Sequence, residues 1–156
     1  MDEKNMLIVL GNNLKRAREN ASMSKSQLVQ LSSYNRQDLA KLEAGQQDAK
    51  LSTIVKLAKC LNVSLPLLFS RTFTSIAEPY IQDNYLLVFT ENISKRINNG
   101  FTGIEICRMT TLDTGTLCRI MHHTIKDSRI STLFLIANSV GIELETAFKR
   151  IEEEKQ

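Results

Sequence analysis

The sequence predicts an all-α fold of two tandem five-helix bundles, and three observations carry this prediction. Apolar residues recur at helical spacing along almost the whole chain of 156 residues, and the alternating pattern of β-strands is nearly absent. Glycine and proline, which interrupt helices, number only six and two. The stretch LSTIVKLAKCLNVSLPLLF, beginning at Leu51, also aligns with ISTLFLIANSVGIELETAF, beginning at Ile130, with apolar positions in register.

The first bundle is predicted to fill residues 1–70, and its opening helix spans roughly residues 5–20. Helical spacing places four apolar residues on one stripe of this helix: Leu7, Leu10, Leu14 and Ala17. Ser24 and Gln27 form a capping box that opens the second helix. In this motif the serine side chain accepts a bond from the backbone N–H of the glutamine, three residues on, and the glutamine side chain accepts one from the serine's own backbone N–H.

Three further helices are predicted in this bundle. The third is RQDLAKLEA, with Asn35 as its N-cap and Gly45 as its C-terminal stop. The fourth, LSTIVKLAKCL, begins near Leu51, and the fifth, SLPLLF, begins at Ser64.

A domain boundary is predicted in a linker at residues 71–83, where Pro79 interrupts helix propagation. The second domain, residues 84–156, repeats the pattern of the first. The offset is 79 residues from Ile130 onward and becomes 78 upstream, where Leu28 matches Ile106 and Leu39 matches Leu117, because the second copy holds one extra residue before Ile130. Around the first helix two registers remain open: Leu14 with Ile93, or Arg18 with Arg96.

Composition limits the functional classes. With 42% hydrophobic and 24% charged residues the chain is typical of a soluble globular protein. The early apolar run MLIVL follows Asp2 and Glu3 and fits neither a signal peptide nor a membrane span, so a cytoplasmic protein is expected. Three cysteines are an odd number without close pairing, which favours reduced thiols.

Charge is distributed unevenly between the halves of the chain. Residues 1–78 hold 11 Lys and Arg against 7 Asp and Glu, whereas residues 79–156 hold 9 against 10. A basic first half suits a polyanionic partner.

Several runs in the first half carry a family resemblance. These are LGNNLKRAR, MSKSQLV, YNRQDLAKLEAG and LSTIVKLAKCLNVSLPLLF. Together they resemble the Cro/CI repressor (XRE) type of helix-turn-helix domain over residues 7–70, and the second half resembles it more faintly. The resemblance implies a lambda-repressor-like fold for each bundle and double-stranded DNA as the partner.

The helix at residues 35–43 has a face suited to reading DNA. Leu39 and Leu42 are expected to point into the bundle, which leaves Arg36, Gln37 and Lys41 outside to contact bases. An α-helix fits the major groove, where Arg can bond guanine and Gln can bond adenine.

The resemblance also implies roles for six other residues. Four are expected to contact phosphates: Ser24, Lys25, Asn35 and Lys50. Arg18 and Glu43 match the family's internal ion pair, which ties the first helix to the recognition helix.

The second copy departs from the pattern in its recognition segment, DTGTLCRIMHH. Met121 stands where the first copy has glutamate, His123 where it has glycine, and Gly115 offers no side chain to read a base. The remaining candidates for DNA contact are Thr114, Thr116, Arg119 and Lys126. Packing or dimerisation is the alternative role of this half.

Metal binding and catalysis are not expected. Cys107, Cys118, His122 and His123 lie within 17 residues but lack the close-paired ligand spacing of zinc sites. Both cysteines match small positions of the first bundle and are expected to be buried. No Ser/His/Asp grouping, phosphate-binding glycine loop or carboxylate pair can be assembled, so no enzyme, cofactor or small-molecule ligand is expected.

The sequence therefore predicts a DNA-binding transcriptional regulator, a repressor or an activator, that occupies a promoter or operator. Two geometries remain open: an internal pseudo-dimer on unlike half-sites about 34 Å apart, or a homodimer paired through the second domain. The alternative class is a protein-binding adaptor or antitoxin-like regulator that keeps the fold.

Overall fold

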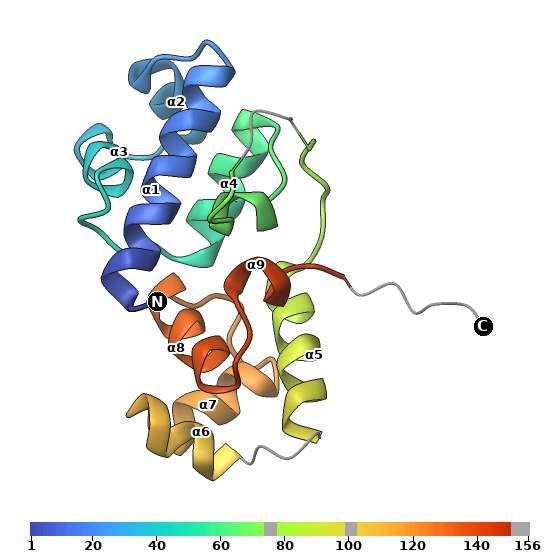
Figure 1. The fold of residues 1–156 in the computed structure, drawn as a ribbon. Coiled ribbons are helices and arrows are strands. Elements are labelled where there is room, and N and C mark those ends of the chain that lie inside the picture. The colour runs from blue at the N-terminus through green and yellow to red at the C-terminus, as the bar shows by residue number, and fades with distance from the viewer. Residues whose placement is uncertain (74–77, 99–102, 151–156) are drawn as a thin grey trace.

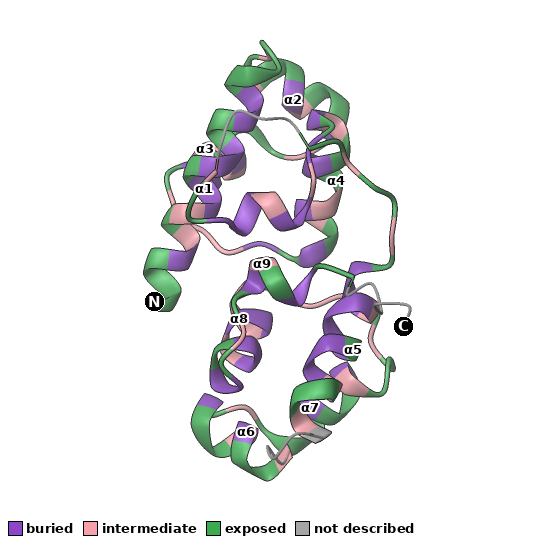
Figure 2. Ribbon diagram, turned by 45° about the vertical axis from the view of Figure 1, so that its right-hand side comes forward, coloured by how far each residue is buried: buried purple, intermediate pink, exposed green. Residues whose placement is uncertain are grey.

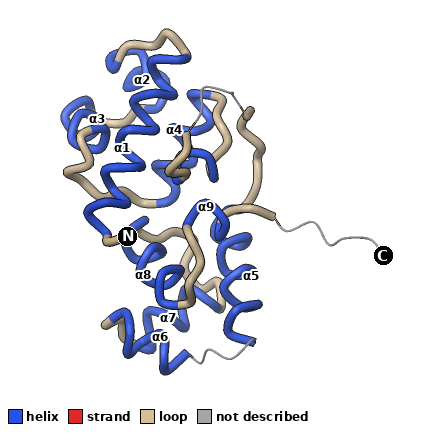
Figure 3. The backbone as a smooth tube through the Cα atoms, viewed as in Figure 1, coloured by secondary structure: helices blue, strands red, loops and turns tan. Residues whose placement is uncertain are grey.

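The computed structural model describes residues 1–73, 78–98 and 103–150, and these ranges are helical without any strand (Figures 1 and 3). The amino-terminal half contains α1 Glu3–Asn20, α2 Lys25–Ser32, α3 Arg36–Glu43, α4 Leu51–Leu61 and the 3₁₀ helix η1 Pro66–Phe69. The carboxyl-terminal half contains α5 Tyr85–Asn98, α6 Gly103–Thr110, α7 Thr114–Met121, α8 Ile130–Ser139 and α9 Leu144–Ala147. The predicted all-α fold is confirmed.

The local signals for the helix ends of the amino-terminal half are confirmed. Ser24 Oγ accepts a bond from the Gln27 backbone N–H at 3.1 Å, and Gln27 Oε1 accepts one from the Ser24 N–H at 2.7 Å. Asn35 caps α3, and Gly45 follows it with a left-handed φ of 71°. Ser24 and Asn35 accept bonds from N–H groups that have no partner inside the helix, and at the other end of α3 the Gly45 N–H donates to the Leu42 carbonyl oxygen.

The fifth predicted helix was placed too early. It begins at Pro66 rather than Ser64 and is a short 3₁₀ helix. The Ser64 backbone N–H donates to the Glu78 carbonyl oxygen at 2.8 Å, so this residue is held by the linker. Pro66 has no N–H to satisfy and its φ is already close to helical, which favours it at the first helical position.

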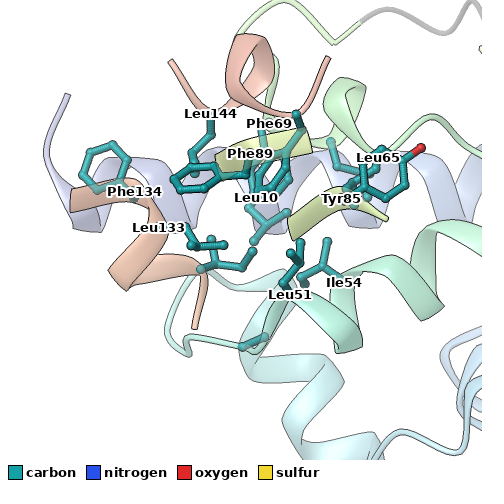
Figure 4. Close-up of a cluster of buried hydrophobic side chains, with 14 of the residues drawn as sticks. Leu10, Leu51, Ile54, Leu65, Phe69, Tyr85, Phe89, Leu133, Phe134 and Leu144 are labelled. Atoms are coloured by element: carbon teal, nitrogen blue, oxygen red, sulfur yellow. The ribbon is translucent and has the colours of Figure 1, made fainter. Parts of the chain in front are cut away.

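One hydrophobic core runs through both halves. Figure 2 shows buried residues on the inward faces of helices in each half. Where the halves meet, Leu10, Leu51 and Phe69 from one side lie together with Phe89 and Leu133 from the other (Figure 4). The halves are therefore joined by continuous apolar packing.

Close packing of α1 on α3 depends on a glycine. A Cβ atom added at Gly11 would lie 2.4 Å from the Leu42 carbonyl oxygen and 2.7 Å from that of Glu43. Real Cβ atoms do not approach backbone oxygens so closely, so only glycine permits this contact. It fixes the carboxyl end of α3 against the first helix.

The same hydrogen bonds occur in both halves. Asn13 Nδ2, buried in α1, donates to the Leu68 and Ser70 carbonyl oxygens at 2.9 and 2.7 Å. Asn92 Nδ2 in α5 donates to the Ala147 and Lys149 carbonyl oxygens, both at 2.8 Å. The two asparagines are 79 residues apart, and so are their acceptors, Leu68 from Ala147 and Ser70 from Lys149. This is the spacing of the first of the two registers left open above.

Burial of the two cysteines was predicted wrongly. Cys118 is exposed and Cys107 is half-buried. The buried face of α7 carries Leu117 and Ile120, and Cys118 lies outside it. Its counterpart Ala40 is itself only half-buried, so this position does not belong to the core in either half.

Candidate nucleic-acid interface

Helix α3 is held by its apolar residues and leaves its polar face to solvent. Leu39 and Leu42 are fully buried. Arg36, Gln37 and Lys41 are exposed, as the sequence predicts. These three side chains therefore project from an eight-residue helix into solvent and carry hydrogen-bond donors.

The turn that joins α2 to α3 contains a left-handed residue and a tyrosine that packs on the core. Ser33 adopts a left-handed φ of 58°, and Tyr34 packs half-buried against the core. Burial is the main reason that the pKa of Tyr34 is raised, and the negative charge of Asp38 raises it further. The hydrogen bond from Gln47 lowers this pKa but does not cancel the two raising effects. Its hydroxyl therefore stays neutral at physiological pH.

The caps of α2 and α3 keep donor groups for other partners. Asn35 Oδ1 accepts bonds from the Gln37 and Asp38 N–H groups at 2.8 and 3.2 Å, and its Nδ2 group takes no part in the cap. Ser24 and Lys50 are exposed like Asn35, and Lys25 is half-buried. Donors at the amino end of a helix favour phosphate oxygens.

An ion pair links α1 to the last residue of α3. Arg18 Nε lies 2.7 Å from Glu43 Oε1, and the two side chains are 10% and 3% exposed. Arg18 Nη1 also donates to the Met23 carbonyl oxygen at 2.9 Å. Within the described residues Glu43 Oε2 has no hydrogen-bond partner. The pair therefore positions α3 and leaves one buried oxygen unsatisfied.

The α7 face differs from that of α3. Thr114 and Arg119 are exposed, Thr116 is half-buried, and Arg119 Nη2 lies 3.4 Å from Thr116 Oγ1. Lys126, in the loop after α7, is exposed. Bonds from the Thr116 side chain and backbone hold the pKa of the capping Asp113 below its usual range.

Sequence reasoning missed one basic residue, Arg129. Lys50 and Arg129 pair as an isolated antiparallel bridge between the halves, and both are exposed. They lie 79 residues apart, so extending the offset of 79 one position upstream of Ile130 would have paired the phosphate candidate Lys50 with Arg129. The structure thus places a basic side chain from each half at the junction.

Comparison with known proteins gives a family match for the amino-terminal half. A family model described as a helix-turn-helix domain matches residues 9–68. The control protein C.SmaI of Serratia marcescens is 33% identical over 63 residues, which cover 40% of this chain and 75% of that protein. The chain belongs to the XRE-type helix-turn-helix family. No solved structure matches it.

Membership of this helix-turn-helix family makes the chain a DNA-binding regulator of transcription, and the matched residues 9–68 include α2 and α3. Among the residues that the structure describes, no group of three or more His, Cys, Asp or Glu side chains is placed to hold a metal ion. None of the described helices has the length and apolarity required to cross a membrane.

Proposed function

We propose that this helix-turn-helix protein regulates transcription by reading a specific sequence in the major groove of double-stranded DNA with α3. The exposed set Arg36, Gln37 and Lys41 carries the proposal. Buried Leu39 and Leu42 hold the other side of the helix, so these three side chains project away from the core. Each bidentate contact from Arg to guanine or from Gln to adenine discriminates by about 1 to 3 kcal/mol.

Phosphate contacts complete the proposed interface. Ser24, Lys25, Asn35 and Lys50 surround the amino ends of α2, α3 and α4. Contacts of this kind set register and orientation on the duplex, and base contacts then supply specificity. Binding at a promoter or operator would act by occupancy.

We also propose that residues 84–156 form a second, degenerate helix-turn-helix unit behind a linker at 71–83, with the first unit at 1–70. The repeated bonds of Asn13 and Asn92 support this division. In the second unit Ile97 and Met121, both half-buried, stand where the first has Arg18 and Glu43. An apolar pair would thus replace the ion pair.

Selection of duplexes from a random library tests the proposed reading. The unaltered chain should enrich one motif, and Arg36→Ala together with Gln37→Ala should remove the preference at definite positions while binding of the backbone persists. Arg16→Ala, an exposed change on α1, is the matched control and should leave the motif unchanged. If no motif is enriched even at low salt, the proposed reading of DNA is wrong and the protein-binding adaptor becomes the favoured function.

Lys50→Ala tests the phosphate contacts. If Lys50 neutralises one phosphate, its loss should reduce the slope of log affinity against log salt by about one without altering the selected motif. Lys59, exposed at the other end of α4, is the control and its alanine variant should keep the slope. Equal slopes for all three proteins would remove Lys50 from the interface.

A further inference from the structure

The junction between the two halves is built from reciprocal contacts. Asp48 Oδ1 accepts a bond from the Ser131 backbone N–H at 3.2 Å, and Asp48 Oδ2 accepts one from the Ser131 hydroxyl. Asp127 Oδ1 accepts a bond from the Ser52 backbone N–H at 3.1 Å, and Asp127 Oδ2 accepts one from the Ser52 hydroxyl. Asp48 and Asp127 are counterparts at an offset of 79 residues, as are Ser52 and Ser131.

The backbone repeats this reciprocity. The Ile130 N–H donates to the Ala49 carbonyl oxygen and the Leu51 N–H donates to the Ser128 carbonyl oxygen, both at 2.8 Å. Ala49 and Ser128 are again counterparts, as are Leu51 and Ile130. At the centre of this pattern Lys50 faces Arg129, its own counterpart.

A second pair of counterparts meets farther along the junction. The rings of Phe69 and Phe148 lie 5.2 Å apart, and η1 packs on α9. Phe148 is the counterpart of Phe69 at the same offset. Two separate places where a residue meets its own counterpart define the line of a local two-fold axis, as in the isologous interface of a symmetric dimer.

The reciprocal aspartates also make the junction specific. The N-cap residues of α4 and α8, Lys50 and Arg129, provide no side-chain cap of their own. Asp48 of the first half instead accepts bonds from Ser131 in the first turn of α8, and Asp127 of the second half accepts bonds from Ser52 in the first turn of α4. Negative charge is favourable at the amino end of a helix. Each half therefore completes a helix end that the other half leaves open, which holds them in one arrangement.

A two-fold axis places counterparts at the same height along it. Helices α3 and α7 are counterparts, so they lie at one level on either side of the axis. Figure 1 shows them in the two opposite halves of an elongated molecule, with α9 between the halves. Lys50 and Arg129, both exposed, lie at the axis between these helices.

We propose that one chain is a rigid pseudo-dimer that binds a single duplex carrying two unlike half-sites at a fixed spacing of about one helical turn. α3 contacts the first half-site through its long side chains. α7 contacts the second through Thr114, Thr116 and Arg119, and Lys50 and Arg129 neutralise phosphates between them. The inference rests on the proposed function and adds the geometry and stoichiometry of its DNA partner.

The two half-sites should differ in how many base positions the protein specifies. The α3 face carries Arg36, Gln37 and Lys41, whereas the α7 face has one long basic side chain and exposed Gly115. Glycine allows a close approach of the backbone to phosphate but supplies no base contact. The second half-site should therefore show fewer defined bases than the first, and the bound site should not be a palindrome.

The test uses the full chain and duplexes carrying its selected motif. Native mass spectrometry should find one chain per duplex. Inserting five base pairs between the two elements, about half a helical turn, should lower affinity about ten-fold or more, because a fixed junction cannot follow the second element. Arg119→Ala should lower affinity for the uninterrupted duplex and have no further effect on the interrupted one.

A variant of the junction supplies the second arm. Asp48→Ala together with Asp127→Ala should reduce the penalty of insertion, because the apolar contacts that remain are less directional and fix the relative orientation of the halves less firmly. Asp83→Ala, which removes an ion pair with Arg150 but none of the reciprocal bonds of Asp48 and Asp127, is the matched control and should keep the full penalty. Circular dichroism checks that each variant is folded. If the double variant is unfolded, the effect of the five-base-pair insertion on binding by the unaltered chain decides whether the pseudo-dimer is correct.

The outcomes separate the two proposals. A motif that is palindromic and binds two chains, or one whose affinity ignores the insertion and Arg119, overturns the pseudo-dimer and leaves reading by α3 intact. Failure to enrich any motif overturns the proposed function and this inference with it.

Discussion

Arg18→Ala is expected to lower the free energy of unfolding by about 3 to 5 kcal/mol, because it leaves the Glu43 carboxylate buried without its partner. The Glu43 side chain is only 3% exposed and its Oε2 already lacks a partner in the described part of the chain. Glu43 ends α3, so the loss should also weaken DNA binding by loosening the recognition helix. Chemical denaturation and DNA titration measure the two effects.

Two comparisons make the Arg18 prediction specific. Arg16→Ala alters an exposed arginine on the same helix and should change stability by less than about 0.5 kcal/mol. Arg18→Met together with Glu43→Leu removes both charges, and should recover most of the lost stability because buried ion pairs often do no better than apolar residues. Equal melting of Arg18→Ala and the unaltered chain would contradict an energetic role for the pair.

Gly11→Ala is expected to destabilise the protein by about 3 kcal/mol through overpacking. The added Cβ would lie 2.4 Å from the Leu42 oxygen, and this neighbour is backbone that cannot rotate away. Helix α3 must therefore move from α1. DNA affinity should fall together with stability, since Leu42 belongs to the helix that carries Arg36 and Gln37.

Gly115→Ala is the same chemical change as Gly11→Ala but is expected to raise the stability of the protein rather than lower it. A Cβ at this position in α7 would meet Asp113 Oδ1 at 3.6 Å, which is an ordinary contact. Alanine has the higher helix propensity, so stability should rise by about 0.5 to 1 kcal/mol. If both glycine variants shifted the unfolding midpoint in the same direction, crowding at α1 and α3 would not be the cause.

Local sequence patterns predicted much of the fold. Ser24 with Gln27, Asn35 and Gly45 mark helix ends within three residues of the groups that they satisfy, so no distant contact is needed to interpret them. Helical periodicity likewise separated buried Leu39 from the exposed side chains around it. The same patterns failed for Ser64, because its N–H is bonded to Glu78 in the linker.

Parts of the candidate site were visible only by comparing distant segments. Arg129 has no local signal, since it opens a helix that lacks a side-chain cap of its own. Its position depends on pairing with Lys50, far away in the sequence. Cys118 was misplaced for a related reason: similarity of residue size with Ala40 carried no information about which side of α7 would be covered.

The sequence by itself determined the helical class, the caps of α2 and α3, the outward face of α3 and the similarity, at an offset of 79 residues, between the segments that begin at Leu51 and Ile130. These features arise from hydrogen bonds and periodicity within a few residues, or from direct comparison of two segments. Only the tertiary structure decided how the halves meet, because the bonds of Asp48 to Ser131 and of Asp127 to Ser52 join groups more than seventy residues apart. Such contacts form only once both halves have folded, and no local preference of the chain encodes them.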